Sequence, residues 1–130
     1  MYRDRSDVAL MRRVVNVVQK VLHTRLHEGS GAAYDELHAR VPDDLLAALV
    51  AAGVTDWRIW RSGREVFHLL DVDDYAAMRA FLRDHPANVA WQAQVTPLQA
   101  VPDDYSGDDD GLAQVWSLAG QRGDDTAARD

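Results

Sequence analysis

Two residues four positions apart, Tyr34 and His38, have the side-chain types and the spacing that proton transfer requires. Side chains with this spacing project from the same side of a helix. At about 100° per residue, Tyr34 lies about 20° and His38 about 60° from Val41, within an apolar stripe. An imidazole with its usual pKa near ~6.5 can give and take protons at neutral pH. We therefore predict that both residues line a pocket between a helix and a sheet; alternatively, they are core-edge residues with satisfied hydrogen bonds.

Two tryptophans could form the walls of such a pocket. Trp57 begins a predicted strand, and Trp91 lies in a predicted short helix, where Gln92 follows it directly. An indole face is a suitable platform for the C–H side of a sugar, and an amide can hydrogen-bond to hydroxyl groups. The alternative is that both indoles simply fill the core.

The five histidines do not suggest a metal site. His23 and His27 are predicted to lie on a strand, about 13 Å apart, which is too far to share one ion. His68 and His85 have no partner at the spacing of metal ligands. The sequence has no HExxH pattern, P-loop or GxGxxG turn, and no serine triad is recognisable. We therefore predict no metal.

The elements that would position these residues follow from apolar periodicity and from residues that begin or end helices. Pro42 lies inside the longest helical pattern and predicts a kink or a restart near Val41. Gly53 ends that pattern, Ser30 is a candidate cap at its start, and a later helix could be capped by Asp73 or Asp74. The predicted strands are residues 13–26, 54–61, 64–71 and 112–118; the predicted helices are residues 32–52, 75–83 and 86–95; a polar loop is predicted at residues 96–111.

This order predicts an α+β fold of the ferredoxin-like type, β-α-β-β-α-β, with one antiparallel sheet. Helices would cover one face of that sheet. The other face, which we expect to carry Val21 and Trp57, needs a cover, and a second copy of the sheet is the simplest one. We therefore predict a homodimer of the dimeric α/β-barrel type. Residues 1–12 are predicted to be a flexible extension, residues 13–119 a single domain and residues 120–130 a disordered tail.

Composition narrows the possible functions. The chain has 130 residues, which fits one domain, and a net charge of −7, which argues against binding nucleic acid. The absence of cysteine excludes disulfides and thiol nucleophiles and fits a reducing compartment. Without a long apolar run or a signal peptide, we expect a cytoplasmic protein that binds no membrane. We expect the acidic residues 103–110 to form a solvated surface loop; alternatively, this loop, which contains Tyr105 beside Ser106-Gly107, is a lid over the site.

Several segments in register resemble the L-rhamnose mutarotase family, over about residues 18–118. Tyr34 and His38 match the family's Y-x-x-x-H helix start, and Asn88, Trp91 and Gln92 match its N-x-x-W-[WQ] segment. The matching segments are Arg25-Leu26-His27-Glu28-Gly29, Tyr34-Asp35-Glu36-Leu37-His38, Asp56-Trp57, His85-Pro86-Ala87-Asn88-Val89-Ala90-Trp91-Gln92 and Gln114-Val115-Trp116-Ser117-Leu118.

The resemblance implies an isomerase that exchanges the α and β anomers of L-rhamnose or of another 6-deoxy sugar such as L-fucose. Acid–base proton shuttling suffices for this reaction, so no metal or organic cofactor is expected. His38 takes the place of the family's catalytic proton donor, with Tyr34 beside it. The sugar-contacting positions correspond to Tyr34, Trp57, Trp91 and Gln92.

The sequence departs from the family at one point, and two other functions stay open. The family's Trp-Pro pair after the histidine corresponds here to Pro42 and Asp43, which leaves the identity of the sugar open. One alternative is a cofactor-free, monooxygenase-like enzyme that acts on an aromatic substrate. The other is a non-catalytic ligand-binding module on the same dimeric scaffold.

Overall fold

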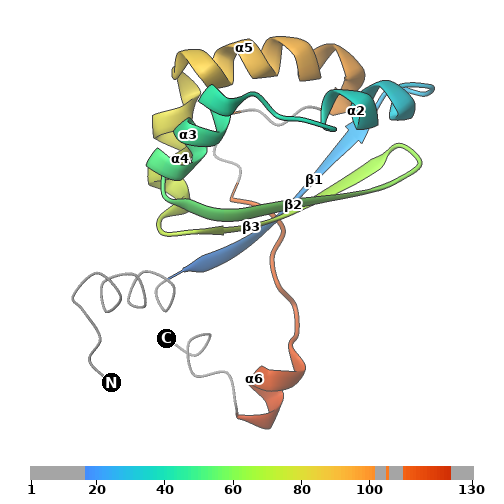
Figure 1. Ribbon diagram of the computed structural model, residues 1–130. Coiled ribbons are helices and arrows are strands. Elements are labelled where there is room, and N and C mark those ends of the chain that lie inside the picture. The colour runs from blue at the N-terminus through green and yellow to red at the C-terminus, as the bar shows by residue number, and fades with distance from the viewer. Residues whose placement is uncertain (1–16, 102–104, 106–109, 124–130) are drawn as a thin grey trace, which may run out of the picture.

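The fold is one four-stranded antiparallel sheet with helices packed on one face (Figure 1). The computed structural model describes residues 17–101, 105 and 110–123. The predicted extension at residues 1–12, the predicted strand start at residues 13–16 and most of the acidic loop and tail lie outside these residues. The strand order is β2-β3-β1-β4, so the predicted ferredoxin-like α+β class is confirmed. The strands are β1 Val18–Leu26, β2 Val54–Ser62, β3 Glu65–Val72 and β4 Gln99–Val101.

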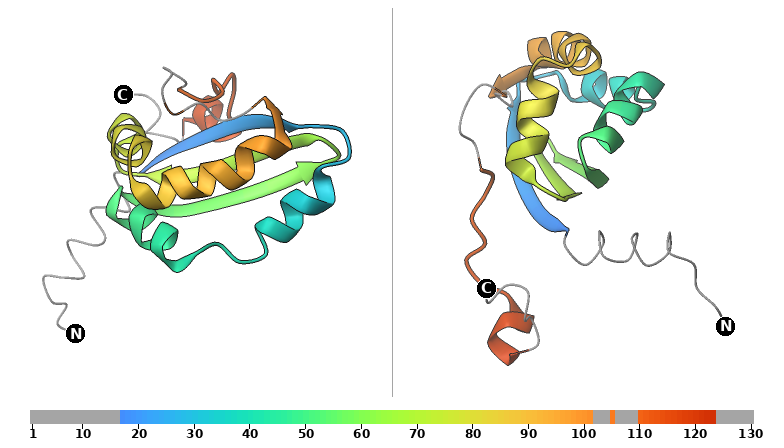
Figure 2. Two further views of the ribbon diagram at one scale, coloured as in Figure 1. Left: turned by 90° about the horizontal axis from the view of Figure 1, so that it is seen from above. Right: turned by 90° about the vertical axis from the view of Figure 1, so that its left-hand side faces the viewer.

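The helices that follow the β2–β3 hairpin begin and end where the sequence predicts. Asp74 accepts a hydrogen bond from the backbone N–H of Ala77 and caps one of them, and Pro86 begins the next. Helices α2 to α5 all lie on the same side of the sheet (Figure 2). The helices are α2 Gly31–Leu37, α3 Asp43–Ala51, α4 Tyr75–Arg83, α5 Pro86–Val95, the short 3₁₀ helix η1 Thr96–Leu98 and α6 Leu118–Arg122.

The single helix predicted at residues 32–52 is in fact two helices, α2 and α3. Pro42 has no backbone N–H, and in a continuous helix its ring would clash with the carbonyl of His38. The chain therefore leaves the helical conformation after Leu37 and resumes it at Asp43. The predicted cap at Ser30 makes no side-chain hydrogen bond to α2. As a consequence of the break, His38 lies at the C-terminal end of α2 and not within a helix.

The core forms where the inward faces of β1 and β3 meet the helices. Alternate residues of β3 are buried, and one of them, His68, is polar. Two apolar side chains of α4, Met78 and Leu82, are completely buried. The least exposed core side chains are Leu22, Leu26, Val66, Leu70, Val72, Met78 and Leu82.

A β-bulge decides which way β2 presents its side chains. Val54 pairs with Val72, but Asp56 pairs with Asp71, so Thr55 is an extra residue in β2. The extra residue shifts the alternation by one, and Trp57 then pairs with the buried Leu70. Trp57 therefore faces the helices, and our prediction that it lies on the uncovered face is wrong.

The C-terminal part of the chain differs most from the prediction. Residues 112–118 are not a strand, and the fourth strand is β4, inside the predicted loop at residues 96–111. The backbone N–H of Leu112 donates to the Val21 carbonyl at 2.7 Å, but Val115 is 95% exposed. Apolar residues here lack the alternation of a strand covered on one side. The segment leaves the sheet on the side opposite the helices and ends in α6, which includes the start of the predicted tail (Figures 1 and 2).

Candidate active site

A cavity of about 480 Å³ lies between the sheet and helices α2, α3 and α5. This volume suits a small organic ligand. The structure brings all five residues singled out from the sequence to this cavity, although they come from three different elements or their ends. They are Tyr34, His38, Trp57, Trp91 and Gln92.

The imidazole of His38 is held in one orientation and one tautomer. Its Nδ1 lies 2.9 Å from the backbone carbonyl oxygen of Tyr34. A carbonyl oxygen only accepts hydrogen bonds, so Nδ1 carries the proton and neutral His38 has its lone pair on Nε2. The ring stacks on the Tyr34 ring with a centroid distance of 4.0 Å, and the Trp91 ring meets it edge-on at 5.0 Å. His38 is thereby prepared to exchange a proton at Nε2.

Burial sets the protonation states of both residues. It lowers the pKa of His38, opposed by the hydrogen bond to the Tyr34 carbonyl and by the charge of Asp35. Burial and Asp35 raise the pKa of Tyr34 to about 12. Asp35 itself accepts two hydrogen bonds from Arg61, which lower its pKa and keep it ionised. At neutral pH, His38 is therefore predominantly neutral, whereas the Tyr34 phenol keeps its proton.

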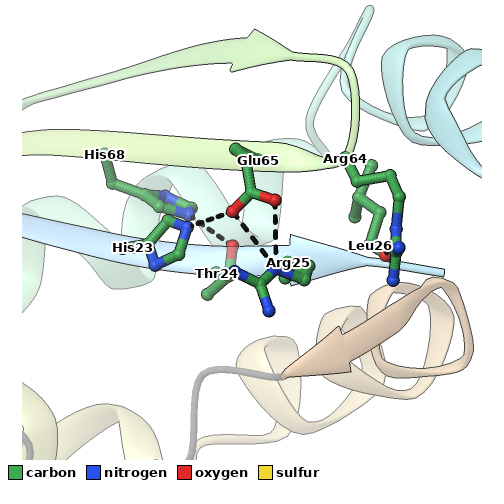
Figure 3. Close-up of polar contacts among 7 residues, drawn as sticks. All are labelled: His23, Thr24, Arg25, Leu26, Arg64, Glu65 and His68. Carbon is green, nitrogen blue, oxygen red and sulfur yellow. Dashed lines mark hydrogen bonds and ion pairs between the residues drawn. The ribbon is translucent and has the colours of Figure 1, made fainter.

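The sheet contributes a neutral polar cluster to the site, formed by Thr24, His68 and Trp57. The indole N–H of Trp57 donates to Nδ1 of His68 at 3.2 Å, so His68 must carry its proton on Nε2. Nε2–H then donates to Thr24 Oγ1, also at 3.2 Å (Figure 3). Burial, with smaller effects of His38 and His23, lowers the pKa of His68 to about 4. His68 thus stays neutral and fixes the orientation of the Trp57 indole.

Sequence reasoning did not select His68 as a site residue, because it has no partner at metal-ligand spacing. A different signal was present in the sequence. Val66, His68 and Leu70 alternate along a predicted strand, which places the imidazole on the inward face with the two core residues.

Helix α5 supplies an amide pair to the other wall of the cavity. Asn88 is 3% exposed, and its Nδ2 donates to the Leu82 carbonyl at 3.0 Å. Its Oδ1 accepts from Nε2 of Gln92 at 3.3 Å. Asn88 therefore positions Gln92, one turn further along the helix, beside Trp91.

Two further lining residues come from the segment that follows α5. Gln99 of β4 and Tyr105 both line the cavity, and both are buried. The prediction of a solvated loop is therefore wrong for Tyr105. The sequence pattern did not indicate Gln99, because a three-residue strand is too short to show an alternation.

The remaining lining is mostly apolar and lies toward α3. Leu46 and Val50 of α3 are 46% and 68% exposed, and Ile59 of β2 is 37% exposed. The other apolar lining residues are Val41, Leu45, Leu49, Val54 and Val95.

Within the part of the chain that the structure describes, no group of three or more His, Asp or Glu residues is placed to hold a metal ion. Among the described helices, none combines the length and the apolar character that crossing a membrane needs.

Solved structures that share this fold include two enzymes. An L-rhamnose mutarotase, FA22100 from Formosa agariphila, is 19% identical, with a TM-score of 0.62 over 78% of this chain and 98% of that one. Tetracenomycin F2 cyclase from Streptomyces glaucescens, a type-II polyketide cyclase, is 18% identical, with a TM-score of 0.52 over 77% of this chain and 94% of that one. At these identities the likeness shows the fold alone.

Sequence comparison identifies the family. No curated protein matches the chain. A sequence profile of the L-rhamnose mutarotase family, however, matches residues 19–118, which include every lining residue of the cavity. Because this match covers most of the chain, the protein belongs to the L-rhamnose mutarotase family and is by class a sugar mutarotase, an isomerase.

Proposed function

We propose that the protein interconverts the α and β anomers of a 6-deoxy sugar, such as L-rhamnose or L-fucose, in the cavity beside His38. The observation that carries this proposal is the fixed His38 ring, whose Nδ1 is bound to the Tyr34 carbonyl while Nε2 is left to act. The name of the family and of its structural relative supports L-rhamnose as the first sugar to test.

The reaction requires one proton to move between two oxygens of the sugar. Nε2 of neutral His38 accepts the proton of the anomeric hydroxyl, the bond between C1 and the ring oxygen breaks, and C1 becomes an aldehyde. The protonated imidazole returns the proton to the former ring oxygen. Rotation about the C1–C2 bond followed by reversal of these steps gives the other anomer. Tyr34 keeps its proton and can donate a hydrogen bond to the oxygen on which negative charge develops.

The remaining predicted residues would hold the sugar during this exchange. The indoles of Trp57 and Trp91 offer apolar faces for its C–H groups, and Gln92 offers an amide for its hydroxyls. The His68 contact keeps the Trp57 indole in place before the sugar arrives.

Exchange spectroscopy by NMR tests this function directly. L-Rhamnose, L-fucose and L-arabinose are each measured with and without protein, and we expect faster exchange between the two anomeric signals of at least one 6-deoxy sugar. A protein that binds these sugars but leaves their exchange rates unchanged would be a binding module. If the sugars neither bind nor exchange faster, the proposal is wrong.

We further propose that the protein is a homodimer. Three apolar residues on the uncovered sheet face support this: Val21, Trp60 and Phe67 are 37%, 54% and 40% exposed. The segment of residues 112–118 leaves the sheet on the same side (Figure 1), and its Val115 and Trp116 are exposed. A second copy would cover this apolar surface. Light scattering after size-exclusion chromatography should give twice the chain mass, and a monomer at every concentration would contradict the proposal.

We place this activity in the cytoplasm. The cysteine-free sequence supports a reducing compartment. Fractionation of cells that produce the protein, followed by immunoblotting, tests this location, and recovery in the secreted fraction would contradict it.

A further inference from the structure

The carboxamide of Gln99 is an unusual feature of the cavity. Gln99 is 7% exposed, and it enters the cavity from β4, where it pairs with Leu26 of β1. Its Oε1 is buried and accepts no hydrogen bond from any of the described residues. A buried acceptor without a partner destabilises a folded protein, so most such groups are paired.

The other buried imidazole and amide side chains that line the cavity, His68 and Asn88, already use their hydrogen-bonding atoms. Both ring nitrogens of His68 are engaged, one with Trp57 and one with Thr24. The amide of Asn88 donates to Leu82 and accepts from Gln92. Gln99 therefore differs from its neighbours, because its buried oxygen has no hydrogen-bond partner among the described residues, and rotation of the terminal carboxamide would turn this oxygen toward the cavity that the residue lines.

We propose that Gln99 is a substrate-binding residue whose Oε1 accepts a hydrogen bond from a sugar hydroxyl. The inference rests on the proposed function and adds a specificity determinant to it. A ligand with a hydroxyl at this point satisfies the buried oxygen, whereas a ligand without a donor leaves it unpaired inside the complex. The contact thus favours a polyhydroxylated ligand over a flat apolar one.

This role has a signature that a structural glutamine would not show. Replacing Gln99 by Met keeps the length of the side chain and removes the unpaired oxygen. The sugar-free variant should therefore melt at a higher temperature than the wild type, while its affinity for sugar falls. A glutamine that supports the fold would instead lower the melting temperature when it is replaced. Gln94→Met is the matched control, because Gln94 is exposed on α5 and lies outside the cavity lining.

The experiment compares wild type, Gln99→Met, Gln99→Leu and Gln94→Met in thermal melts without sugar and in NMR titrations with L-rhamnose. We expect about tenfold weaker binding for both Gln99 variants, in line with the loss of one buried hydrogen bond. The KM should rise about as much, with kcat nearly unchanged, because the contact exists before and during reaction.

Monodeoxy analogues of L-rhamnose locate the donor hydroxyl. Wild type should bind one analogue about tenfold more weakly than the parent sugar, and Gln99→Met should bind the two about equally. A lower melting temperature in both Gln99 variants, or sugar affinity equal to that of wild type, would overturn the role of Gln99. If the wild-type protein does not accelerate anomer exchange, the proposed function is wrong instead. Failure of the role of Gln99 can therefore be distinguished from failure of the proposed function.

Discussion

Two polar clusters lie on opposite faces of β1 and β3, and they differ in burial and in charge. On the helix-covered face, Thr24 and His68 join Trp57 in a buried cluster that is neutral. On the other face, Glu65 accepts hydrogen bonds from His23 at 2.7 Å and from Arg25 at 3.0 Å (Figure 3). His23 and Thr24 are neighbours in sequence, so alternation along β1 alone sends them to these two environments.

The comparison teaches what burial allows on this sheet. Burying a charge on the inner face would destabilise the fold. The side chains of Thr24, His68 and Trp57 are therefore held in place by hydrogen bonds between neutral groups. On the outer face, Arg25 and His23 lower the pKa of Glu65, and solvent screens the resulting ion pairs. We therefore expect changes on the inner face to affect catalysis and stability strongly, and changes in the outer cluster to have small effects.

The largest contrast should be between a histidine inside the cavity and one outside it. We expect His38→Ala to reduce the rate of anomer exchange by about 10²–10⁴-fold, because it removes the group that transfers the proton. Sugar binding, followed by NMR titration, should persist. His27→Ala is the control, since His27 is exposed and outside the cavity. Equal rates for the two variants would remove His38 from the mechanism.

The pH dependence of kcat/KM of the wild type should also reflect the titration of His38. If neutral His38 is the proton acceptor, kcat/KM falls as the pH decreases through the pKa of His38. Burial places that pKa below the ordinary imidazole value of 6.5. Activity should therefore remain high at pH 6.5, and a profile that rises toward acid would contradict this assignment.

The next largest effect is the pH dependence of stability that His68 causes. In the unfolded chain this imidazole has a pKa near 6.5, whereas in the folded protein its pKa is about 4. Between these values the unfolded state binds more protons, so stability falls as the pH decreases from about 6.5 to about 4, by at most about 3 kcal/mol. Urea unfolding at a series of pH values measures this slope.

A matched pair of variants isolates His68 in that experiment. His68→Gln keeps an acceptor for Trp57 and a donor for Thr24 but does not titrate, so the part of the slope due to His68 should disappear, while His38, whose pKa burial also lowers, keeps a smaller part. His23→Gln, on the outer face, should leave the slope nearly intact. The carboxylates Asp35 and Glu65 have pKa values below their ordinary 3.8 and 4.5, so their own losses come at still lower pH. An unchanged slope in His68→Gln would show that His68 is not the buried neutral group.

The smallest effect should come from the outer cluster. Glu65→Gln removes the charge that His23 and Arg25 share, but all three side chains are partly open to solvent. We expect a change in melting temperature close to the limit of measurement, which disappears in high salt. A large loss of stability that salt does not alter would contradict this contrast between the two faces.

Much of the fold was predictable because local signals agree with the tertiary structure. Asp74 and Pro86 mark the starts of α4 and α5, and Gly53, with a φ of +93°, ends the region of α3. The spacing of Tyr34 and His38 brought them to one cavity with Trp91, although the helix that was expected to continue through Val41 stops before it.

The parts that could not be predicted depend on pairing between distant segments. β4 has only three residues, and its strand conformation comes from Arg25 and Leu26 of β1, not from its own alternation. Gln99 enters the cavity only because of that pairing. Residues 112–118 show the opposite case, since their apolar content indicated a strand but the backbone contact that the structure shows between them and β1 is the single hydrogen bond from Leu112 to Val21.

The extra residue Thr55 has a consequence for how this protein can vary. Pairing in β2 is continuous on both sides of Thr55, so deleting this residue would leave Val54, Asp56 and Trp57 opposite Val72, Asp71 and Leu70 in unbroken alternation. Trp57, Ile59 and Arg61 would then still face the helices. A one-residue deletion between Trp57 and the β2–β3 turn would instead move Trp57 to the opposite face, so chain length constrains the binding wall on the turn side of the bulge and not at the bulge itself.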